Sequence, residues 1–305
     1  MSDTGGKLLD SKAVAQGEAL GLLARQVVEG FLSGEHKSPF RGFAIEFTQH
    51  REYAPGDDLR HVDWKVLGRT DRFYLKQYEQ ETNFVCHLLV DGSESMKYAS
   101  KGGPSKLQYA RQLAACLAYL VLHQRDAASL VLFDNAVQRY VPRTGSLGSI
   151  HSIMATLAGF DPAAGTAGAT ALGPVLHRMA GTNPRKAVFV IISDLLDDEA
   201  AIADGIQHLR FIGHEVIVFH TLDPWELTFP FTGNVEFNGY EGAAKLTTRP
   251  AELRKTYLAE FNAFLGRVRR ACENNKSHYV LADTSHPLHE TLSAYLAFRE
   301  KSHGR

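Results

Sequence analysis

Three oxygen-bearing side chains at alternate positions follow an apolar run in the stretch VCHLLVDGSESMK, residues 85–97. The run VCHLLV is typical of a buried strand, and Asp91, Ser93 and Ser95 come where that strand should end. Side chains of these types can cap a helix, supply a nucleophile or bind a hard cation. The other polar residues of the sequence help to distinguish these roles.

A second aspartate stands at the end of another predicted strand. Asp194 closes the apolar run AVFVIISD, residues 187–194. In an open parallel sheet, ligands bind outside the carboxyl ends of the strands. If the two strands are neighbours, Asp91 and Asp194 face one crevice, and Ser93 and Ser95 add neutral oxygens to it.

A threonine from a third loop is expected to join them. In GTAGATALGPVLHRMA, residues 165–180, Leu172, Leu176 and Met179 repeat at helical spacing. Thr170 then lies just before a predicted helix, with its hydroxyl free to face the crevice. Thr166, earlier in the same Gly/Ala-rich stretch, is the alternative, and we favour Thr170 because of the helical phase.

These carboxylates and hydroxyls form a ligand set made only of oxygen. Such a set suits Mg²⁺, or Mn²⁺ in its place, because these hard cations prefer octahedral oxygen coordination and retain water. Zinc would require nitrogen or sulfur ligands. Asp91 and Asp194 only balance the charge of a divalent ion, so an open coordination position can accept a Glu or Asp side chain from a partner protein.

The constellation resembles the metal-ion-dependent adhesion site of the von Willebrand factor A fold. The matching residues are DGSES at 91–95, Thr170 in Gly-Ala-Thr-x-Leu, and Ser193-Asp194. Ala169 and Ala171 depart from that pattern, which usually has Gly and Asp beside the threonine. The resemblance implies that Asp91, Ser93, Ser95 and Thr170 hold the metal directly or through water, and that Asp194 orients a bound water.

The upstream run GEHKSPFRGFAIEFTQHREYAPGDDLRHVDWKVLGRTDRFYLKQYEQE, residues 34–81, is similar to the segment that defines the domain-of-unknown-function 58 family. The likeness covers nearly the whole chain, since GHEVIVFHTLDPWEL, residues 213–227, also fits it. Members are bacterial proteins often encoded beside MoxR-type AAA+ ATPases. The resemblance implies a non-enzymatic, metal-dependent protein-binding module. Such a module would be an adaptor or co-chaperone for a MoxR-type ATPase in the assembly or maturation of another protein complex.

The charged segment within that run has no assigned chemistry. Its candidate interaction or structural residues are Arg51, Glu52, Tyr53, Gly56, Asp57, Asp58, Arg60, Asp63 and Trp64. A catalytic or nucleic-acid-binding surface is one interpretation. We favour a structural network of Arg–carboxylate pairs around Trp64 that docks the N-terminal part on the sheet.

Helix capping is the structural alternative for the same polar residues. Ser93 and Ser95 would then cap a short helix, and Asp194 would join the acidic cluster 197–199 at the N-terminus of the next helix. We favour a ligand role for Asp194 because it ends the strand, whereas residues 197–199 are better placed for the helix.

An enzyme is the functional alternative. A magnesium-dependent phosphohydrolase would use Asp91 as its nucleophile at the strand end. Enzymes resembling the haloacid dehalogenase family carry a general-acid aspartate two residues later, where this chain has Ser93. The sequence also shows no evident lysine near Asp194 to steady a phosphoryl group, and it contains no P-loop, dinucleotide or nucleophile-elbow motif. We therefore expect a protein that is not an enzyme.

Strands and helices alternate from Val85 onward. Strands are expected at 85–91, 127–134, 137–141, 187–194, 214–220 and 277–283, and helices at 106–126, 148–158, 172–179, 197–213, 251–274 and 286–299. Unbroken apolar strands are typical of parallel strands covered on both faces. The sequence predicts an α/β fold with a doubly wound, mostly parallel sheet, which the resemblance identifies as the von Willebrand factor A type.

An N-terminal helix at 11–32 and an extended appendage precede the sheet, which suggests two parts. Residues 1–82 comprise that helix and the charged segment, packed on the main domain. Residues 83–305 form the von Willebrand factor A-like domain with its C-terminal helices.

The composition sets limits on partners and location. The 305 residues include 33 Lys and Arg against 34 Asp and Glu, so net charge gives no argument for nucleic acid. Apolar runs such as AACLAYLVL, residues 114–122, are about half the roughly 20 residues needed to cross a bilayer, and the N-terminus lacks a signal-peptide pattern. We expect a cytoplasmic protein with no membrane span, in which Cys86, Cys116 and Cys272 are reduced packing residues.

Overall fold

The computed structural model describes residues 18–25, 27, 28, 46–52, 66, 68, 73–79, 85–161, 171–237, 246–293 and 295. The chain forms two compact units, one made of Met1–Lys37 with Val85–Arg305 and the other of Ser38–Phe84. The N-terminal helix, described at residues 18–25, belongs with the large unit. The division predicted from the sequence groups it instead with the charged segment, whose packing on the main domain stays a prediction.

The described part of the small unit is a pair of antiparallel strands. β1 (Glu46–Glu52) pairs with β2 (Tyr74–Glu79), from Glu46 opposite Glu79 to Glu52 opposite Tyr74. Arg51 and Glu52, two of the family-specific residues, lie in β1. The others, from Tyr53 to Trp64, lie outside the described residues, so the predicted Arg–carboxylate network stays a prediction.

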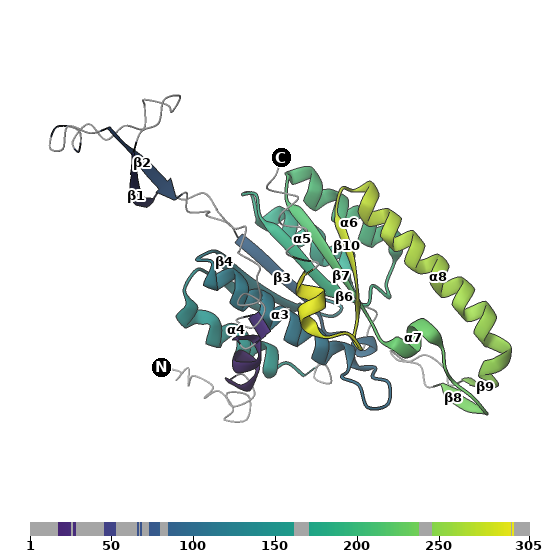
Figure 1. The fold of residues 1–305 in the computed structure, drawn as a ribbon. Coiled ribbons are helices and arrows are strands. Elements are labelled where there is room, and N and C mark those ends of the chain that lie inside the picture. Colours follow the sequence, from purple (N-terminus) through teal and green to yellow (C-terminus); the bar gives the residue numbers. More distant parts are fainter. Residues whose placement is uncertain are drawn as a thin grey trace, which may run out of the picture. The chain divides into compact units, whose positions relative to one another are not determined.

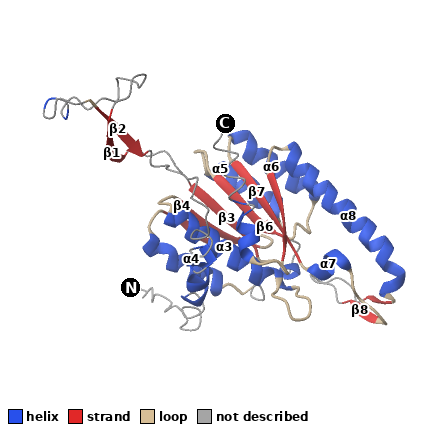
Figure 2. Cartoon of the chain, viewed as in Figure 1, coloured by secondary structure: helices blue, strands red, loops and turns tan. Residues whose placement is uncertain are grey.

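A six-stranded sheet forms the centre of the large unit (Figures 1 and 2). Its strands are β3 (Val85–Asp91), β4 (Ala127–Phe133), β5 (Val137–Thr144), β6 (Val188–Ser193), β7 (Glu215–Leu222) and β10 (His278–Asp283), in the spatial order β10-β7-β6-β3-β4-β5. All neighbouring pairs are parallel except β4 and β5 at one edge. Counted along the chain, the order is 3-2-1-4-5-6, the doubly wound arrangement, which confirms the predicted fold class.

Helices cover both faces of this sheet. α3 (Lys106–His123) and α4 (Ile150–Ala158) lie on one face, and α5 (Leu172–Thr182), α6 (Glu199–Ile212) and α8 (Pro250–Asn274) lie on the other (Figures 1 and 2). Every residue of β3 and β6 is therefore buried. Double coverage explains why these strands read as continuous apolar runs rather than as alternating patterns.

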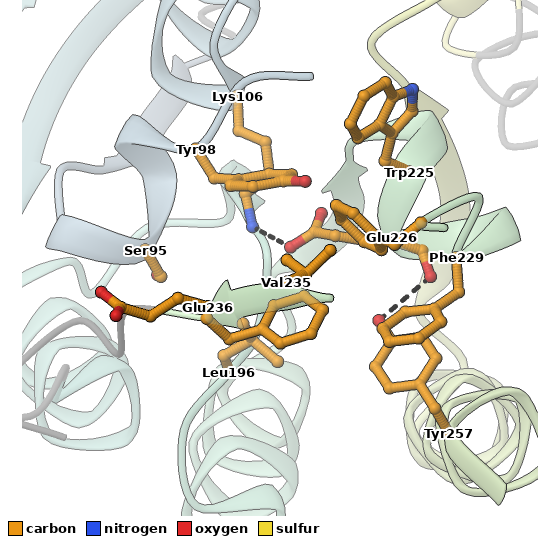
Figure 3. A pocket seen from close by; sticks show the side chains of 12 residues that line it. Ser95, Tyr98, Lys106, Leu196, Trp225, Glu226, Phe229, Val235, Glu236 and Tyr257 are labelled. Carbon is orange, nitrogen blue, oxygen red and sulfur yellow. Dashed lines mark hydrogen bonds and ion pairs between the residues drawn. The ribbon is translucent and has the colours of Figure 1, made fainter. Parts of the chain in front are cut away.

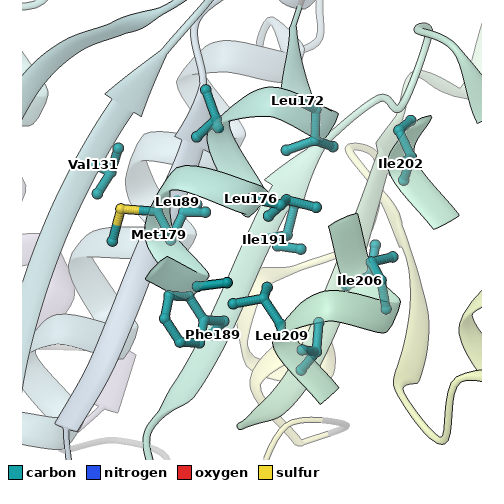
Figure 4. Packing of buried hydrophobic residues seen from close by; sticks show 14 of the residues in the cluster. Leu89, Val131, Leu172, Leu176, Met179, Phe189, Ile191, Ile202, Ile206 and Leu209 are labelled. Carbon is teal, nitrogen blue, oxygen red and sulfur yellow. The ribbon is translucent and has the colours of Figure 1, made fainter. Parts of the chain in front are cut away.

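Aliphatic side chains fill the space between the sheet and helices α5 and α6 (Figure 4). Leu89, Val131 and Ile191 come from adjacent strands and belong to one buried cluster with Leu176 of α5 and Ile206 of α6. Burial of each such side chain stabilises the fold by about 1.5–3 kcal/mol relative to its exposure to water. This packing fixes β3 and β6, the two strands whose ends carry the predicted site aspartates.

Shorter elements lie between the main strands and helices. They are η2 (Glu94–Lys97), η3 (Leu147–Ser149), α7 (Pro224–Thr228), and the antiparallel pair β8 (Val235–Phe237) and β9 (Leu246–Thr248). From Val85 to Asp283, the main helices and strands begin and end within a few residues of their predicted bounds. The predicted helices 11–32 and 286–299 lie partly outside the described residues. The helix predicted to reach residue 126 ends at His123, where Gln124 donates its N–H to the Leu120 carbonyl.

The three cysteines agree with a further expectation. Cys86, Cys116 and Cys272 are free and buried, as expected of packing residues. Burial raises the pKa of the Cys116 and Cys272 thiols to about 12, so both stay protonated at neutral pH. None of the helices that the structure describes combines the length and the apolarity needed to cross a membrane.

Helices α5 and α6 approach each other closely through two glycines. A Cβ atom at Gly173 would lie 2.8 Å from both the Cβ and the backbone oxygen of Ala201, and one at Gly205 would lie 2.8 Å from the Cβ of Leu176. Carbon atoms in packed interiors stay about 3.5–4.0 Å apart. The contact between these helices therefore depends on the absence of a side chain at both positions.

Replacing Gly173 by alanine tests this contact. Gly173→Ala should lower the free energy of unfolding by about 2 kcal/mol, because the added methyl group forces the helices apart. Gly181→Ala in the same helix is the matched control, since a Cβ there meets no atom within 4 Å. It should be neutral or stabilise by about 0.5–1 kcal/mol, since glycine is a poor helix former. Urea denaturation measures both, and equal stabilities would contradict the close approach.

Candidate metal centre

The two predicted site aspartates lie at the ends of neighbouring parallel strands. Asp91 is the last residue of β3, Asp194 follows Ser193 at the end of β6, and Val90 pairs with Ile192 across the two strands. β3 and β6 are the strands at which the winding of the sheet reverses. The crevice at such a switch point is where doubly wound proteins bind ligands. The predicted neighbourhood of Asp91 and Asp194 is confirmed.

The carboxylate of Asp91 is buried and held on both oxygens. Oδ1 accepts the backbone N–H of Ser93 at 2.8 Å, and Oδ2 accepts the hydroxyl of Ser193 at 2.6 Å. The Ser193 hydroxyl in turn accepts the N–H of Leu195 at 2.9 Å. Asp91 has no ion-pair partner among the described residues. Its negative charge is therefore stabilised by dipoles only.

The hydroxyls of Ser93 and Ser95 lie together beside this carboxylate. Their Oγ atoms are 3.0 Å apart, and Ser93 is buried. Ser93 precedes η2, yet its side chain makes no capping hydrogen bond there. Helix capping therefore does not explain these serines, whereas Ser105 does cap α3 by accepting the N–H of Gln108. Both hydroxyl oxygens retain lone pairs for another ligand.

Gly92, between Asp91 and Ser93, has a steric role. A Cβ atom at this position would lie 2.2 Å from Cε1 of Phe160, well inside van der Waals contact. The N–H of Gly92 also donates to the Phe133 carbonyl at 2.7 Å, which continues the pairing of β3 with β4 by one residue. The glycine in DGSES therefore lets the loop pass beneath an aromatic ring.

Asp194 is held in a turn with unusual backbone geometry. Its backbone carbonyl accepts from Nε2 of His220 at 2.8 Å, and the next residue, Leu195, has a φ of 54°. A positive φ is uncommon for leucine and is typical of strained functional segments. Burial lowers the pKa of His220 to about 4, so the ring is neutral and its Nδ1 accepts from the hydroxyl of Tyr279. A neutral histidine thus anchors the turn.

The acidic residues after Asp194 belong to the neighbouring helices. Asp198 caps α6 by accepting the N–H groups of Ala200 and Ala201, and Asp197 accepts the N–H of Leu172 at the start of α5. The carboxylate of Asp194 takes no part in capping α6. The helix-dipole explanation therefore fits Asp197 and Asp198 but not Asp194, as expected.

A buried lysine contacts Asp194, which contradicts the expectation that no lysine lies near it. Nζ of Lys106 is 2.8 Å from Oδ2 of Asp194 and 2.7 Å from Oε1 of Glu226. The expectation was wrong because it considered only residues adjacent in sequence, whereas Lys106 begins α3 and lies 88 positions from Asp194. Lysine is unfavourable at a helix N-terminus, where the dipole is positive. A lysine at the first position of a predicted helix is therefore the sequence feature that could have identified Lys106.

Glu226 is the second residue that the sequence did not indicate. It belongs to α7, where its Oε2 accepts the N–H of Asp223 at 2.8 Å in a capping box, while Oε1 accepts from Lys106. Burial raises the pKa of Glu226, and the ammonium of Lys106 opposes that rise. One carboxylate thus both caps α7 and pairs with the buried lysine.

The charges of the site do not balance. Among the described residues, Lys106 forms ion pairs with Asp194 and Glu226 but none with Asp91. Burial would lower the pKa of Lys106, but Asp194 and Glu226 hold it above its ordinary value. Burial, followed by repulsion from Asp194, raises the pKa of Asp91 to about 7. Buried groups gain most from a compensating cation. Excess negative charge and free hydroxyl oxygens therefore fit a hard divalent cation.

The remaining predicted ligands cannot be placed. Thr170 and the alternative Thr166 lie outside the described residues. Ala171 is described, and its N–H donates to the carbonyl of Asp134, the residue after β4. Among the residues that the structure describes, three or more His, Cys, Asp or Glu side chains do not gather in a metal-binding group. A cation at this centre would therefore depend on hydroxyls as well as carboxylates.

Comparison with known proteins gives a family and an uncharacterised relative. A family model described as "Protein of unknown function DUF58" matches residues 49–263. The relative "Uncharacterized protein Rv1480" of Mycobacterium tuberculosis is 28% identical over 233 residues, which cover 75% of this chain and 71% of the relative.

Solved structures resemble the large sheet only distantly. An aerotolerance-related membrane protein from Bacteroides fragilis has a TM-score of 0.49 at 18% identity and is matched over 70% of this chain and 98% of its own. The VWA domain of SpRpn10 has a TM-score of 0.39 at 13% identity, over 69% of this chain and 93% of its own. At scores this low, the fold assignment rests on the strand order of this chain, which is the doubly wound arrangement predicted from the sequence.

Replacing Lys106 tests its ion pairs with the buried carboxylates. Lys106→Met should destabilise the protein by about 3–5 kcal/mol, because Asp194 and Glu226 would remain buried without their cation. Lys101→Met, at an exposed lysine in the loop before α3, should change stability by less than about 0.5 kcal/mol. Urea denaturation in a metal-free buffer compares them. Equal stability of the two variants would show that the buried pairs are not formed in solution.

The raised pKa of Asp91 can be tested through the pH dependence of protein stability. In the folded, metal-free protein this carboxyl keeps its proton up to about pH 7, whereas the unfolded chain releases it near its ordinary value of 3.8. The contribution of this carboxyl to stability is therefore fully present below about pH 3.8, and it is lost as the pH rises from there through 7. Asp91→Asn does not titrate, so its stability relative to wild type should rise by about 2–3 kcal/mol between pH 5 and pH 7.5. Urea denaturation in EDTA measures this difference, and a constant difference contradicts the raised pKa.

Proposed function

This chain belongs to the DUF58 family of proteins of unknown function, and we propose that it is a magnesium-dependent protein-binding module rather than an enzyme. The observation that carries the proposal is the convergence of Asp91, Ser93 and Asp194 at the switch point of the sheet. Ser95 joins them through its hydroxyl, 3.0 Å from that of Ser93. The group consists of carboxylates and hydroxyls, which is the ligand chemistry of Mg²⁺.

The residues of the centre divide into direct ligands and supporting groups. Asp91, Ser93 and Ser95 would hold the ion directly or through water, with Mn²⁺ as a possible substitute and Thr170 as a further ligand. Asp194, engaged by Lys106 on Oδ2, would orient a bound water through its other oxygen. Ser193 supports the centre by fixing Oδ2 of Asp91. The bound cation would supply a Lewis-acidic position for an external ligand.

The charge of the ligand set favours an external carboxylate. Hydroxyl ligands are neutral, and the charge of Asp194 is already shared with Lys106. A divalent cation held mainly by Asp91 and two serines would therefore keep a net positive charge. A Glu or Asp side chain on a partner protein would complete its shell and its charge balance, so the partner should be recognised through an acidic residue.

The proposed system is an adaptor or co-chaperone for a MoxR-type AAA+ ATPase, acting in the assembly or maturation of another protein complex. The support for this part is the likeness of residues 34–81 to the segment that defines the family, whose members are often encoded beside MoxR-type ATPases. The acidic ligand would come from the ATPase or from its client. If the ATPase or its client binds this protein in Mg²⁺ but not in EDTA, the metal mediates the contact. Binding through an ordinary charged surface would persist in EDTA.

A phosphohydrolase with Asp91 as nucleophile is the second candidate, and Lys106 is the observation that favours it. Such an enzyme needs a positive group close to the carboxylates to stabilise the charge of the phosphoryl group, and the ammonium of Lys106 could provide it. Two features oppose it. Lys106 is already paired with Asp194 and Glu226, and Ser93, whose hydroxyl lies against that of Ser95, stands where a general acid is required. Serine is too weak an acid for that step.

Calorimetric titration with Mg²⁺ and Mn²⁺ tests the proposal. Wild type should bind one ion, and Asp91→Asn should reduce the affinity at least tenfold, because it removes the charged ligand while keeping a similar shape. Asp198→Asn is the matched control: it neutralises an aspartate that caps α6, and asparagine caps equally well. Circular dichroism checks the fold of each variant.

Two results would argue against the proposal. Equal metal affinity in wild type and Asp91→Asn would remove Asp91 from the centre. Hydrolysis of p-nitrophenyl phosphate that requires both Mg²⁺ and Asp91 would favour the phosphohydrolase. If Mg²⁺ alone binds weakly, the titration is repeated with Mn²⁺ in the presence of acetate, which stands in for the partner's carboxylate.

A further inference from the structure

A pocket opens beside the candidate metal centre. It has a volume of about 350 Å³, within the roughly 300–1,000 Å³ usual for ligand pockets. Figure 3 shows Tyr98 and Lys106 on one side and Trp225, Phe229 and Tyr257 on the other. Phe231, Val235 and Phe237 complete an apolar wall. The pocket thus draws its lining from segments far apart in the sequence.

The aromatic wall is built in advance of any ligand. Phe229 stacks on Tyr257 with ring centroids 4.4 Å apart, and Phe231 meets Trp225 edge to face at 5.3 Å. The guanidinium of Arg254 donates to the carbonyls of Phe229 and Phe231, both at 2.9 Å. These contacts fix the backbone that carries the rings. A side chain that entered the pocket would therefore lose less free energy to ordering of the protein.

The pocket is continuous with the metal centre. Ser95, a proposed ligand, and Lys106, the partner of Asp194, line both. Leu196, two residues after Asp194, lies on the pocket side and is 46% exposed. A peptide that places a carboxylate on the metal would therefore pass the mouth of the pocket within a few residues.

The charges at the pocket favour an uncharged occupant. Glu226 lines the pocket, and its charge is paired with Lys106 at 2.7 Å. Nζ of Lys106 lies 6.0 Å from the ring centroid of Tyr98, so a cation beside Tyr98 would be repelled by this ammonium, although Glu236 would attract it. An anion would face Glu226 and Glu236. An apolar or aromatic group has neither penalty.

We propose that this pocket receives a large apolar side chain, such as phenylalanine or leucine, from the same partner segment whose carboxylate completes the metal centre. The inference rests on the proposed function and specifies its partner: an acidic residue with a bulky apolar residue a few positions away. The carboxylate would supply metal dependence, and the apolar side chain would supply selectivity. Aromatic anchors in preformed pockets dominate many protein interfaces.

The first part of the test examines the pocket alone. The sequence has two tryptophans, and Trp225 lines the pocket, so 5-fluorotryptophan labelling gives a ¹⁹F signal that Trp225→Phe assigns. N-acetylphenylalaninamide should shift the Trp225 signal with or without Mg²⁺, whereas N-acetylalaninamide should not. Absence of a shift at millimolar N-acetylphenylalaninamide would overturn the proposal, whatever happens at the metal centre.

The second part joins the pocket to the metal. Fluorescein-labelled peptides with one Glu and one Phe, separated by zero to four glycines, are titrated in Mg²⁺ and in EDTA. At one spacing the Phe peptide should bind at least tenfold more tightly than the same peptide with Ala or Lys in place of Phe. This preference should disappear in Phe231→Glu and persist in Phe211→Glu, which makes the same change at a residue that is 89% exposed. Val235→Trp, which fills the pocket, is a second variant if Phe231→Glu folds poorly.

The outcomes separate the two proposals. Equal, Mg²⁺-dependent binding of the Phe, Ala and Lys peptides would overturn the pocket and leave the metal centre intact. Tighter binding of the Lys peptide would overturn it in favour of a cationic occupant. An affinity of the Phe peptide that is the same in Mg²⁺, in EDTA and in Asp91→Asn would overturn the coupling between pocket and metal.

Discussion

Uncompensated negative charge at the ends of two central strands is the constraint on which the rest of this site depends. Asp91 and Asp194 are each 1% exposed, at a position where a parallel sheet cannot avoid bringing strand ends together. Burial of a carboxylate is costly without dipoles or a cation. The Ser93 N–H and the Ser193 hydroxyl serve Asp91, and Lys106 serves Asp194. The charge of Asp194 is therefore balanced by a cation, whereas the charge of Asp91 is stabilised only by hydrogen bonds from neutral groups among the described residues.

The same compensation extends from the candidate metal centre to the pocket. Lys106 also pairs with Glu226, whose second oxygen caps α7. Asp223 in the same capping box accepts the N–H of Ser100, from the loop that follows Ser93 and Ser95. The loop, the lysine and α7 are therefore joined by buried and partly buried hydrogen bonds, which are costly to break once formed. The rings that follow α7 are positioned by contacts that begin at the strand ends.

How far the sequence alone could predict this arrangement depends on the range of each interaction. The strands could be predicted because unbroken apolar runs are a local pattern. The neighbourhood of Asp91 and Asp194 could be predicted because ligands bind at the carboxyl ends of neighbouring parallel strands. Lys106 and Glu226 were missed because their contact spans 120 positions and no local pattern requires it. The aromatic pocket was missed for the same reason, since residues such as Tyr98 and Tyr257 meet only in the folded chain. The choice between Thr170 and Thr166 rests on helical phase alone.

The distribution of charge also supports the proposal of binding over catalysis. Acid–base or nucleophilic chemistry needs a charged group free to change its bonding during the reaction. Here the ammonium of Lys106 and the carboxylates of Asp194 and Glu226 are committed to one another, and the nearby His220 is neutral and held by Asp194 and Tyr279. Asp91 has no ion pair among the described residues; it accepts hydrogen bonds from the Ser93 N–H and the Ser193 hydroxyl, and the neighbouring Asp194 repels its charge. A coordinated cation would stabilise the charge of Asp91 while the ion pairs of Lys106 stay intact.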